Sequence, residues 1–139
     1  MDNSWQYNAR RVAHDIRKRV LGLTIQNNGC YLSQTLSSAD LLATLYTKSL
    51  NLGVSQGAFL PGPNPGTPGH SGVQAGHGAA YNGPRNADLD RILISPAHYA
   101  VASYATLVET GRLSADAFAS FNTDGSSVEM IGAEHSPGF

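Results

Sequence analysis

The sequence predicts an α/β protein that is mostly helical, from one strand-to-helix junction and the helical periods around it. At this junction the apolar run at residues 92–94 ends in Ser95 and Pro96, and His98 then enters the first turn of a helical pattern. Ligands of open parallel sheets bind beyond the carboxyl ends of strands, where free helix N–H groups attract anions. His98 is therefore the first candidate functional residue, although its position alone equally suits local capping or packing.

Length and composition indicate one domain over residues 1–139 and exclude several classes of protein. Charged residues make up 14% of the chain and the net charge is −1, so no basic field indicates nucleic acid. Such sparse charge is typical of a surface covered by partners. Cys30 is the only cysteine, so no internal disulfide forms. Neither a signal core nor a membrane span is recognisable, and we expect a cytoplasmic protein that does not contact membranes.

The first helix is expected over residues 5–25, because small and apolar residues recur there at steps of three and four. This region also carries five of the nine basic residues of the chain. They could contact phosphates or an acidic partner, but a solvated helix face is the favoured interpretation. The five are Arg10, Arg11, Arg17, Lys18 and Arg19, and the inward stripe is Ala9, Val12, Ala13, Ile16, Val20 and Leu23.

A second helix is expected at about residues 38–50. Ser37, followed three residues later by Asp40, resembles a capping box with Asp in place of the usual Glu. Leu41, Leu42 and Leu45 then follow with helical spacing. The sequence therefore predicts that this helix begins directly after Ser37.

Residues 53–90 form a Gly/Pro-rich insertion in which no regular element is expected. It holds nine of the fifteen glycines and five of the seven prolines. A loop of this length suits a lid or a partner-binding arm as well as plain flexibility. His70 and His77 could bind a metal together with His135, but solvent exposure is the favoured interpretation because no carboxylate lies beside them.

A third helix is expected from about residue 97 to residue 110, with Gly111 as its stop signal. Ser114 then begins a short helix, from which Phe118 and Phe121 are expected to pack on the core. The remainder of the chain is rich in turn-forming residues and predicts no further element.

Three segments in this order resemble the N-terminal part of transketolase-like enzymes that depend on thiamine diphosphate. They are residues 36–46, 91–98 and 121–139, and the resemblance runs from Val12 onward except through the Gly/Pro-rich insertion. It implies the beginning of a diphosphate-binding domain, with a parallel sheet flanked by helices. It also implies an oligomer with active sites between diphosphate-binding and pyrimidine-binding domains, where a two-carbon ketol unit passes from a ketose-type donor to an acceptor.

The resemblance also implies roles for individual residues. His98 matches a family histidine that lies beside the cofactor diphosphate and the substrate. Tyr31 stands where the family has a substrate-facing histidine, and a phenol with a pKa of about 10 can donate a hydrogen bond but is a poor proton shuttle. Sugar phosphates are therefore less expected as substrates. A third family histidine aligns with Ile131 or Gly132, and His135 would replace it only if the loop were displaced.

The family's Mg²⁺-binding segment, Gly-Asp-Gly followed some thirty residues later by Asn, has no match in the chain. Asp124 and Gly125 form the nearest pair, but they precede the place where the family motif falls. We therefore expect no metal ligands and no tight binding of thiamine diphosphate by this chain alone.

The chain would be inactive until the remaining diphosphate-binding segment and a pyrimidine-binding subunit complete the assembly. The alternative is a degenerate, non-catalytic fragment that scaffolds a partner through its basic first helix and its Gly/Pro-rich loop.

Overall fold

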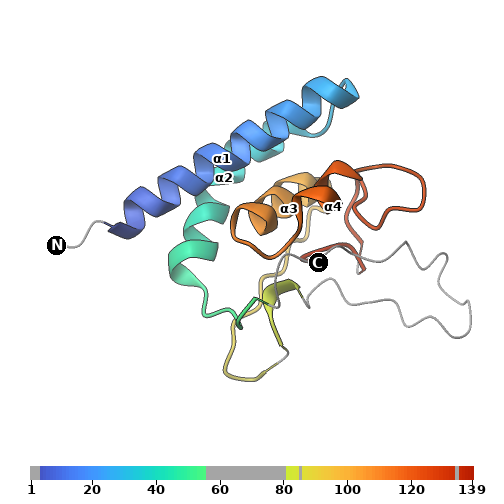
Figure 1. Ribbon diagram of the computed structural model, residues 1–139. Helices are drawn as coiled ribbons and strands as arrows, with labels where there is room; N and C mark the ends of the chain where they lie inside the picture. The colour runs from blue at the N-terminus through green and yellow to red at the C-terminus, as the bar shows by residue number, and fades with distance from the viewer. Residues whose placement is uncertain (1–3, 56–80, 85, 134) are drawn as a thin grey trace, which may run out of the picture.

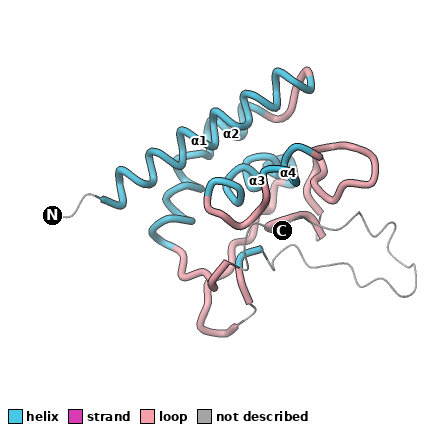
Figure 2. The backbone as a smooth tube through the Cα atoms, viewed as in Figure 1, coloured by secondary structure: helices cyan, strands magenta, loops and turns pink. Residues whose placement is uncertain are grey.

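The computed structural model describes residues 4–55, 81–84, 86–133 and 135–139, and these residues form a set of helices packed around α3 (Figure 1, Figure 2). Long helix α1 runs beside α2, α3 lies against this pair, and α4 packs on α3. The predictions for His70 and His77 fall outside the described residues. The elements are α1 (Ser4–Asn27), α2 (Leu32–Thr44), the π-helix η1 (Leu45–Ser49), the 3₁₀-helix η3 (Ala97–Tyr99), α3 (Ala100–Glu109) and α4 (Ala115–Ala119).

The predicted α/β class is wrong for the described part of the chain, which contains helices but neither a strand nor a sheet. The run at residues 92–94 is irregular, because a strand needs backbone hydrogen bonds to a second strand and none of the described residues supplies one. Ile92 and Ile94 are half-buried, whereas Leu93 is 93% exposed. The run therefore shows the alternating burial that is typical of a strand, but it lacks the backbone hydrogen bonds to a second strand.

Helix α1 confirms the predicted amphipathic stripe. Its six buried residues are the six expected from the helical period, and they face α2 and α3. Ile16 and Val20 are completely buried. None of the described helices combines the length and the apolar character needed to cross a membrane.

Helix α2 begins at Leu32, earlier than predicted, and the capping-box interpretation is wrong. Ser37 and Ser38 lie inside the helix, where their hydroxyls donate to the carbonyl oxygen of Gln34 at 3.0 and 2.7 Å. Asp40 binds Arg17 of α1 instead of a helix terminus. The Arg17 hydrogen bond also holds the pKa of Asp40 below its ordinary value.

Basic residues of α1 also attach it to other helices, so the predicted solvated face is only part of their role. Arg17 links α1 to α2, and its guanidinium also donates to the carbonyl oxygen of Leu36 at 3.2 Å. Arg19 Nε donates to Glu109 Oε1 at the end of α3 at 2.5 Å, in an ion pair whose members are 90 positions apart in the sequence.

Helix α3 is buried on all sides. A helix that is apolar around its whole circumference belongs in a core, and eight consecutive residues from Ala100 to Leu107 are buried. Thr106 satisfies its hydroxyl within the helix by donating to the carbonyl oxygen of Ala102 at 2.7 Å. The Tyr104 ring contacts the ring of Phe121 on one side and that of Phe139 on another, each with a centroid separation of 6.5 Å.

Helix α4 begins as the sequence predicts. Ser114 is its N-cap, and the Ser114 Oγ accepts a hydrogen bond from the backbone N–H of Ala117 at 3.0 Å. Phe118 and Phe121 are both buried, as expected. This short helix therefore closes the core beside α3.

Arg112 joins the start of the Gly/Pro-rich insertion to a later part of the same insertion. Its guanidinium donates to the carbonyl oxygen of Tyr81 at 3.2 Å and to that of Gly53 at 3.1 Å. Gly53 and Gly83 pack so closely that a Cβ on Gly83 would lie 2.6 Å from the Gly53 Cα. Glycine at both positions permits this close approach of the two backbones.

Burial of Tyr104 predicts a loss of stability at high pH. Burial raises the pKa of Tyr104 to about 12, above its value of about 10 in the unfolded chain. The contribution of the protonated Tyr104 phenol to the free energy of unfolding is therefore fully present below pH 10. It is lost as the pH rises towards 12. Tyr104→Phe should therefore release about one proton fewer on unfolding in this range. Urea unfolding at a series of alkaline pH values measures this, and an identical pH dependence in both proteins would contradict it.

Candidate functional site

The structure brings Tyr31 and His98 together, although they are far apart in the sequence. Their ring centroids are 5.7 Å apart, and the ring planes are inclined at 49°. Tyr31 precedes α2, and His98 lies in η3 at the entrance to α3. The Tyr31 side chain is 36% exposed and His98 is half-buried, so both remain accessible to a ligand.

Tyr31 is positioned by the turn between α1 and α2. Asn28 and Gly29 adopt positive φ angles of 54° and 135°, and the N–H of Gly29 donates to the carbonyl oxygen of Thr24 at 3.0 Å. Cys30 then points into the core, where its sulfur lies 3.1 Å from Thr24 Oγ1. Cys30 is only 6% exposed, and its buried thiol fixes the residue that precedes Tyr31.

His98 is positioned by the start of η3. Pro96 has extended backbone angles, and its carbonyl oxygen accepts the N–H of Tyr99 at 3.0 Å, which closes the first helical turn. The Tyr99 ring lies on another side of the imidazole, with a centroid separation of 5.2 Å. Tyr31, His98 and Tyr99 therefore form an aromatic cluster. Sequence reasoning missed Tyr99, for which adjacency to His98 was the only signal.

The C-terminal segment reaches the same region. Gly132 donates its N–H to the carbonyl oxygen of Ala97 at 3.0 Å, directly before His98. In the resemblance, the family's third histidine aligns with Ile131 or Gly132. The structure therefore places this position beside the backbone that carries His98. Gly132 itself is closely covered, because a Cβ there would lie 2.4 Å from the Phe139 ring.

His135, the proposed replacement for that histidine, has another neighbour. Its Nε2 lies 2.9 Å from Glu129 Oε2, and the side chains are 17% and 33% exposed. Within the described part of the chain, no contact joins His135 to Tyr31 or His98. Its predicted role at the cofactor stays a prediction.

The cluster presents groups that bind oxygen-rich small molecules. A phenol both donates and accepts hydrogen bonds, and a neutral imidazole donates from one nitrogen and accepts at the other. Two such groups on separate elements can hold the carbonyl and hydroxyl oxygens of one polar substrate. An imidazole can act as a general acid or base, so His98 is also suited to proton transfer.

The described residues do not fit Mg²⁺ with a diphosphate. No three His, Cys, Asp or Glu side chains gather closely enough to hold a metal ion in the part of the chain that the structure describes. Asp124, in the nearest match to the family motif, is exposed in a turn. Hard cations of this kind need several oxygen ligands in near-octahedral geometry. Any metal ligands would have to come from other polypeptide segments.

Comparison with protein-family models, curated proteins and solved structures finds no match to this chain. The assignment of the candidate site is therefore supported by its geometry and by the motif resemblance alone.

The lack of metal ligands among the described residues predicts weak cofactor binding by the isolated chain. Isothermal titration calorimetry measures this binding when thiamine diphosphate is added to the chain in the presence of Mg²⁺. At micromolar cofactor, we expect no saturable heat of binding that depends on Mg²⁺. The same titration without Mg²⁺ is the control. Micromolar binding that requires Mg²⁺ would contradict this prediction.

Proposed function

We propose that this chain is a component of a transketolase-like enzyme that uses thiamine diphosphate and Mg²⁺. The complete enzyme transfers a two-carbon ketol unit from a ketose-type donor to an acceptor. The remaining diphosphate-binding segment and a pyrimidine-binding subunit supply the cofactor ligands that the described residues lack. The free, buried thiol of Cys30 fits a reducing, cytoplasmic setting.

The contact between Tyr31 and His98 carries this proposal. The resemblance matches both residues to positions that face the substrate, and they are 67 positions apart in the sequence. Their ring centroids lie 5.7 Å apart. This contact joins two residues that the resemblance assigns to the same site, and it therefore supports a shared role.

A second contact supports the same conclusion. The third segment of the resemblance reaches Ala97 through the N–H of Gly132 at 3.0 Å. The second and third segments that carry the resemblance therefore meet at the entrance to α3, where Tyr31 contacts His98.

Tyr31 and His98 have different roles in the proposal. His98 binds the reacting oxygen atoms and transfers protons, since an imidazole can both donate and accept a hydrogen bond. Tyr31 orients the donor through the hydrogen bonds of its phenol. A tyrosine in place of the family histidine favours donors whose recognition does not require a second imidazole.

Replacing His98 with Ala tests the proposal in the reconstituted assembly. Turnover should fall roughly a hundredfold, the scale for losing one positioned proton-transfer or charge-stabilising group. The free energy of unfolding should change little, because a residue at the mouth of a site contributes little to the core. Steady-state kinetics and urea unfolding measure the two effects.

His14→Ala is the matched control, because His14 is an exposed histidine on α1. It should leave turnover unchanged. Equal turnover of the His98 and His14 variants would contradict the proposal and favour a scaffold without a catalytic role. A loss of several kcal/mol in stability for His98→Ala, with normal turnover per folded molecule, would make His98 a structural residue.

A further inference from the structure

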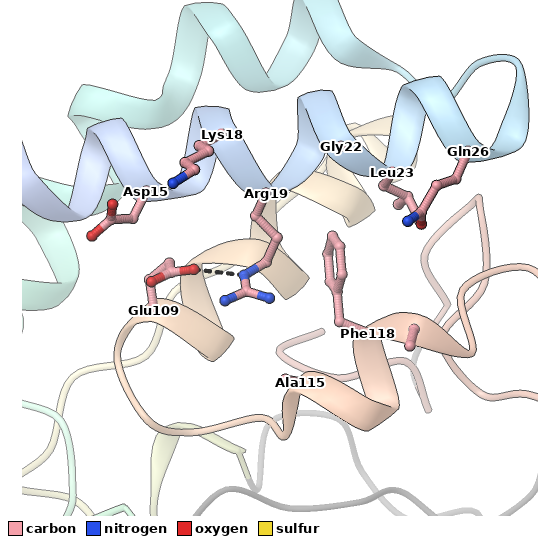
Figure 3. A pocket seen from close by; sticks show the side chains of 10 residues that line it. Asp15, Lys18, Arg19, Gly22, Leu23, Gln26, Glu109, Ala115 and Phe118 are labelled. Atoms are coloured by element: carbon pink, nitrogen blue, oxygen red, sulfur yellow. Dashed lines mark hydrogen bonds and ion pairs between the residues drawn. The ribbon is translucent and has the colours of Figure 1, made fainter.

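A groove of about 480 Å³ lies between α1, α4 and the end of α3, away from the aromatic cluster (Figure 3). One face of α1 forms its longer wall, with residues spaced three and four apart. Phe118 of α4 points towards this wall, and Glu109 of α3 lies at one side. The α1 residues that line it are Asp15, Lys18, Arg19, Gly22, Leu23 and Gln26.

The length of the groove suits a polypeptide better than a small molecule. Residues 15 to 26 of α1 span about 16 Å at the helical rise of 1.5 Å per residue. That distance is three turns of a helix, and the lining residues follow one continuous stripe. A second helix lying along α1 would contact the whole stripe, as in other cases where a helix binds in a groove.

The groove has an apolar floor. Leu23 and Phe118 form this floor, with 6% and 5% of their surfaces exposed. Gly22 lies inside α1, five residues before its last residue Asn27, and glycine within a helix weakens it relative to alanine. A Cβ at Gly22 would meet no atom within 4 Å, so packing within the described chain does not require glycine there. The open wall leaves space for an apolar side chain from outside.

Apolar surface continues from the groove onto the outer face of α1. Leu21 is 48% exposed and Ile25 is 72% exposed, one residue before Gly22 and one before Gln26. A helix seated in the groove would cover part of this surface as well.

The charges of the groove favour an acidic occupant. Arg19 uses its Nε for Glu109, and its two terminal nitrogens have no hydrogen-bond partner among the described residues. Lys18 likewise has no ion-pair partner in that part of the chain. Asp15 is already bound to Arg11 at 3.2 Å. The Arg19 guanidinium also lies over the Phe118 ring, 5.7 Å from its centroid. The groove therefore offers the Lys18 ammonium and the terminal Arg19 nitrogens beside an apolar floor.

We propose that this groove binds an acidic amphipathic helix of a partner polypeptide. Apolar side chains of that helix cover Gly22, Leu23 and Phe118. Carboxylates on its flank bind the Lys18 ammonium and the terminal nitrogens of Arg19, which form charge-assisted hydrogen bonds. This interaction is independent of the catalytic proposal, because it uses none of the residues of the aromatic cluster.

Two synthetic helical peptides of about four turns test the proposal by fluorescence anisotropy with the full chain. Both carry the same apolar stripe, and the flanking positions are Glu in one peptide and Lys in the other. The Glu peptide should bind at least tenfold more tightly, and rising salt should weaken it. Equal affinity of the two peptides, or no saturable binding of the Glu peptide up to about 1 mM, would overturn the proposal.

Variants of the chain locate the binding site. Lys18→Glu should weaken the Glu peptide about tenfold, whereas Arg10→Glu, the same charge change on α1 outside the groove, should have a much smaller effect. Gly22→Leu should fill the groove and weaken binding at least tenfold, and Gly22→Ala should change it less. Equal effects of Lys18→Glu and Arg10→Glu would contradict the assigned surface.

Sedimentation equilibrium tests whether a second copy of the chain, rather than a partner helix, occupies the groove. The proposal predicts no self-association through this groove. A dimer of the chain that Gly22→Leu dissociates would make a second copy the occupant and overturn the proposal.

Discussion

The burial of α3 on every side is the constraint on which the other elements depend. Because eight consecutive residues of this helix are buried, each of its faces needs a covering layer. α1 and α2 cover one side, and Phe121 and Phe139 contact Tyr104 on others. The position of α3 in turn fixes both of its ends. His98 lies at its entrance, and Glu109 at its exit binds Arg19.

The proposed catalytic residues lie at the entrance of α3, and the proposed groove for a partner helix lies at its exit. At the entrance, the buried thiol of Cys30 holds the turn that presents Tyr31 to His98. At the exit, the ion pair of Arg19 and Glu109 forms one side of the groove between α1 and α4. Because one rigid helix separates them, a partner could bind at the groove without covering the aromatic cluster. A component that works only within an assembly needs such a separation between its binding surface and its catalytic residues.

Sequence reasoning succeeded where structure is set by local pattern. The period of α1 identified all six of its buried residues, and Ser114 is the N-cap of α4. It failed where the structure of a segment is determined by residues that are distant in the sequence. The run at residues 92–94 has the composition of a strand, but a strand also needs a paired neighbour. Asp40 has the spacing of a capping residue, yet Arg17 binds it from another helix. The proximity of Tyr31 to His98 depends on the packing of α2 against α3, which no local spacing encodes.

The account depends most directly on the contact between Tyr31 and His98, and a nuclear Overhauser experiment on the folded chain tests it. With ring centroids 5.7 Å apart, the ring protons of Tyr31 and His98 should give cross-peaks. The neighbouring pair His98 and Tyr99, at 5.2 Å, provides the internal reference. Cross-peaks for both pairs would support the account. A clear His98–Tyr99 signal with none between Tyr31 and His98 would contradict it.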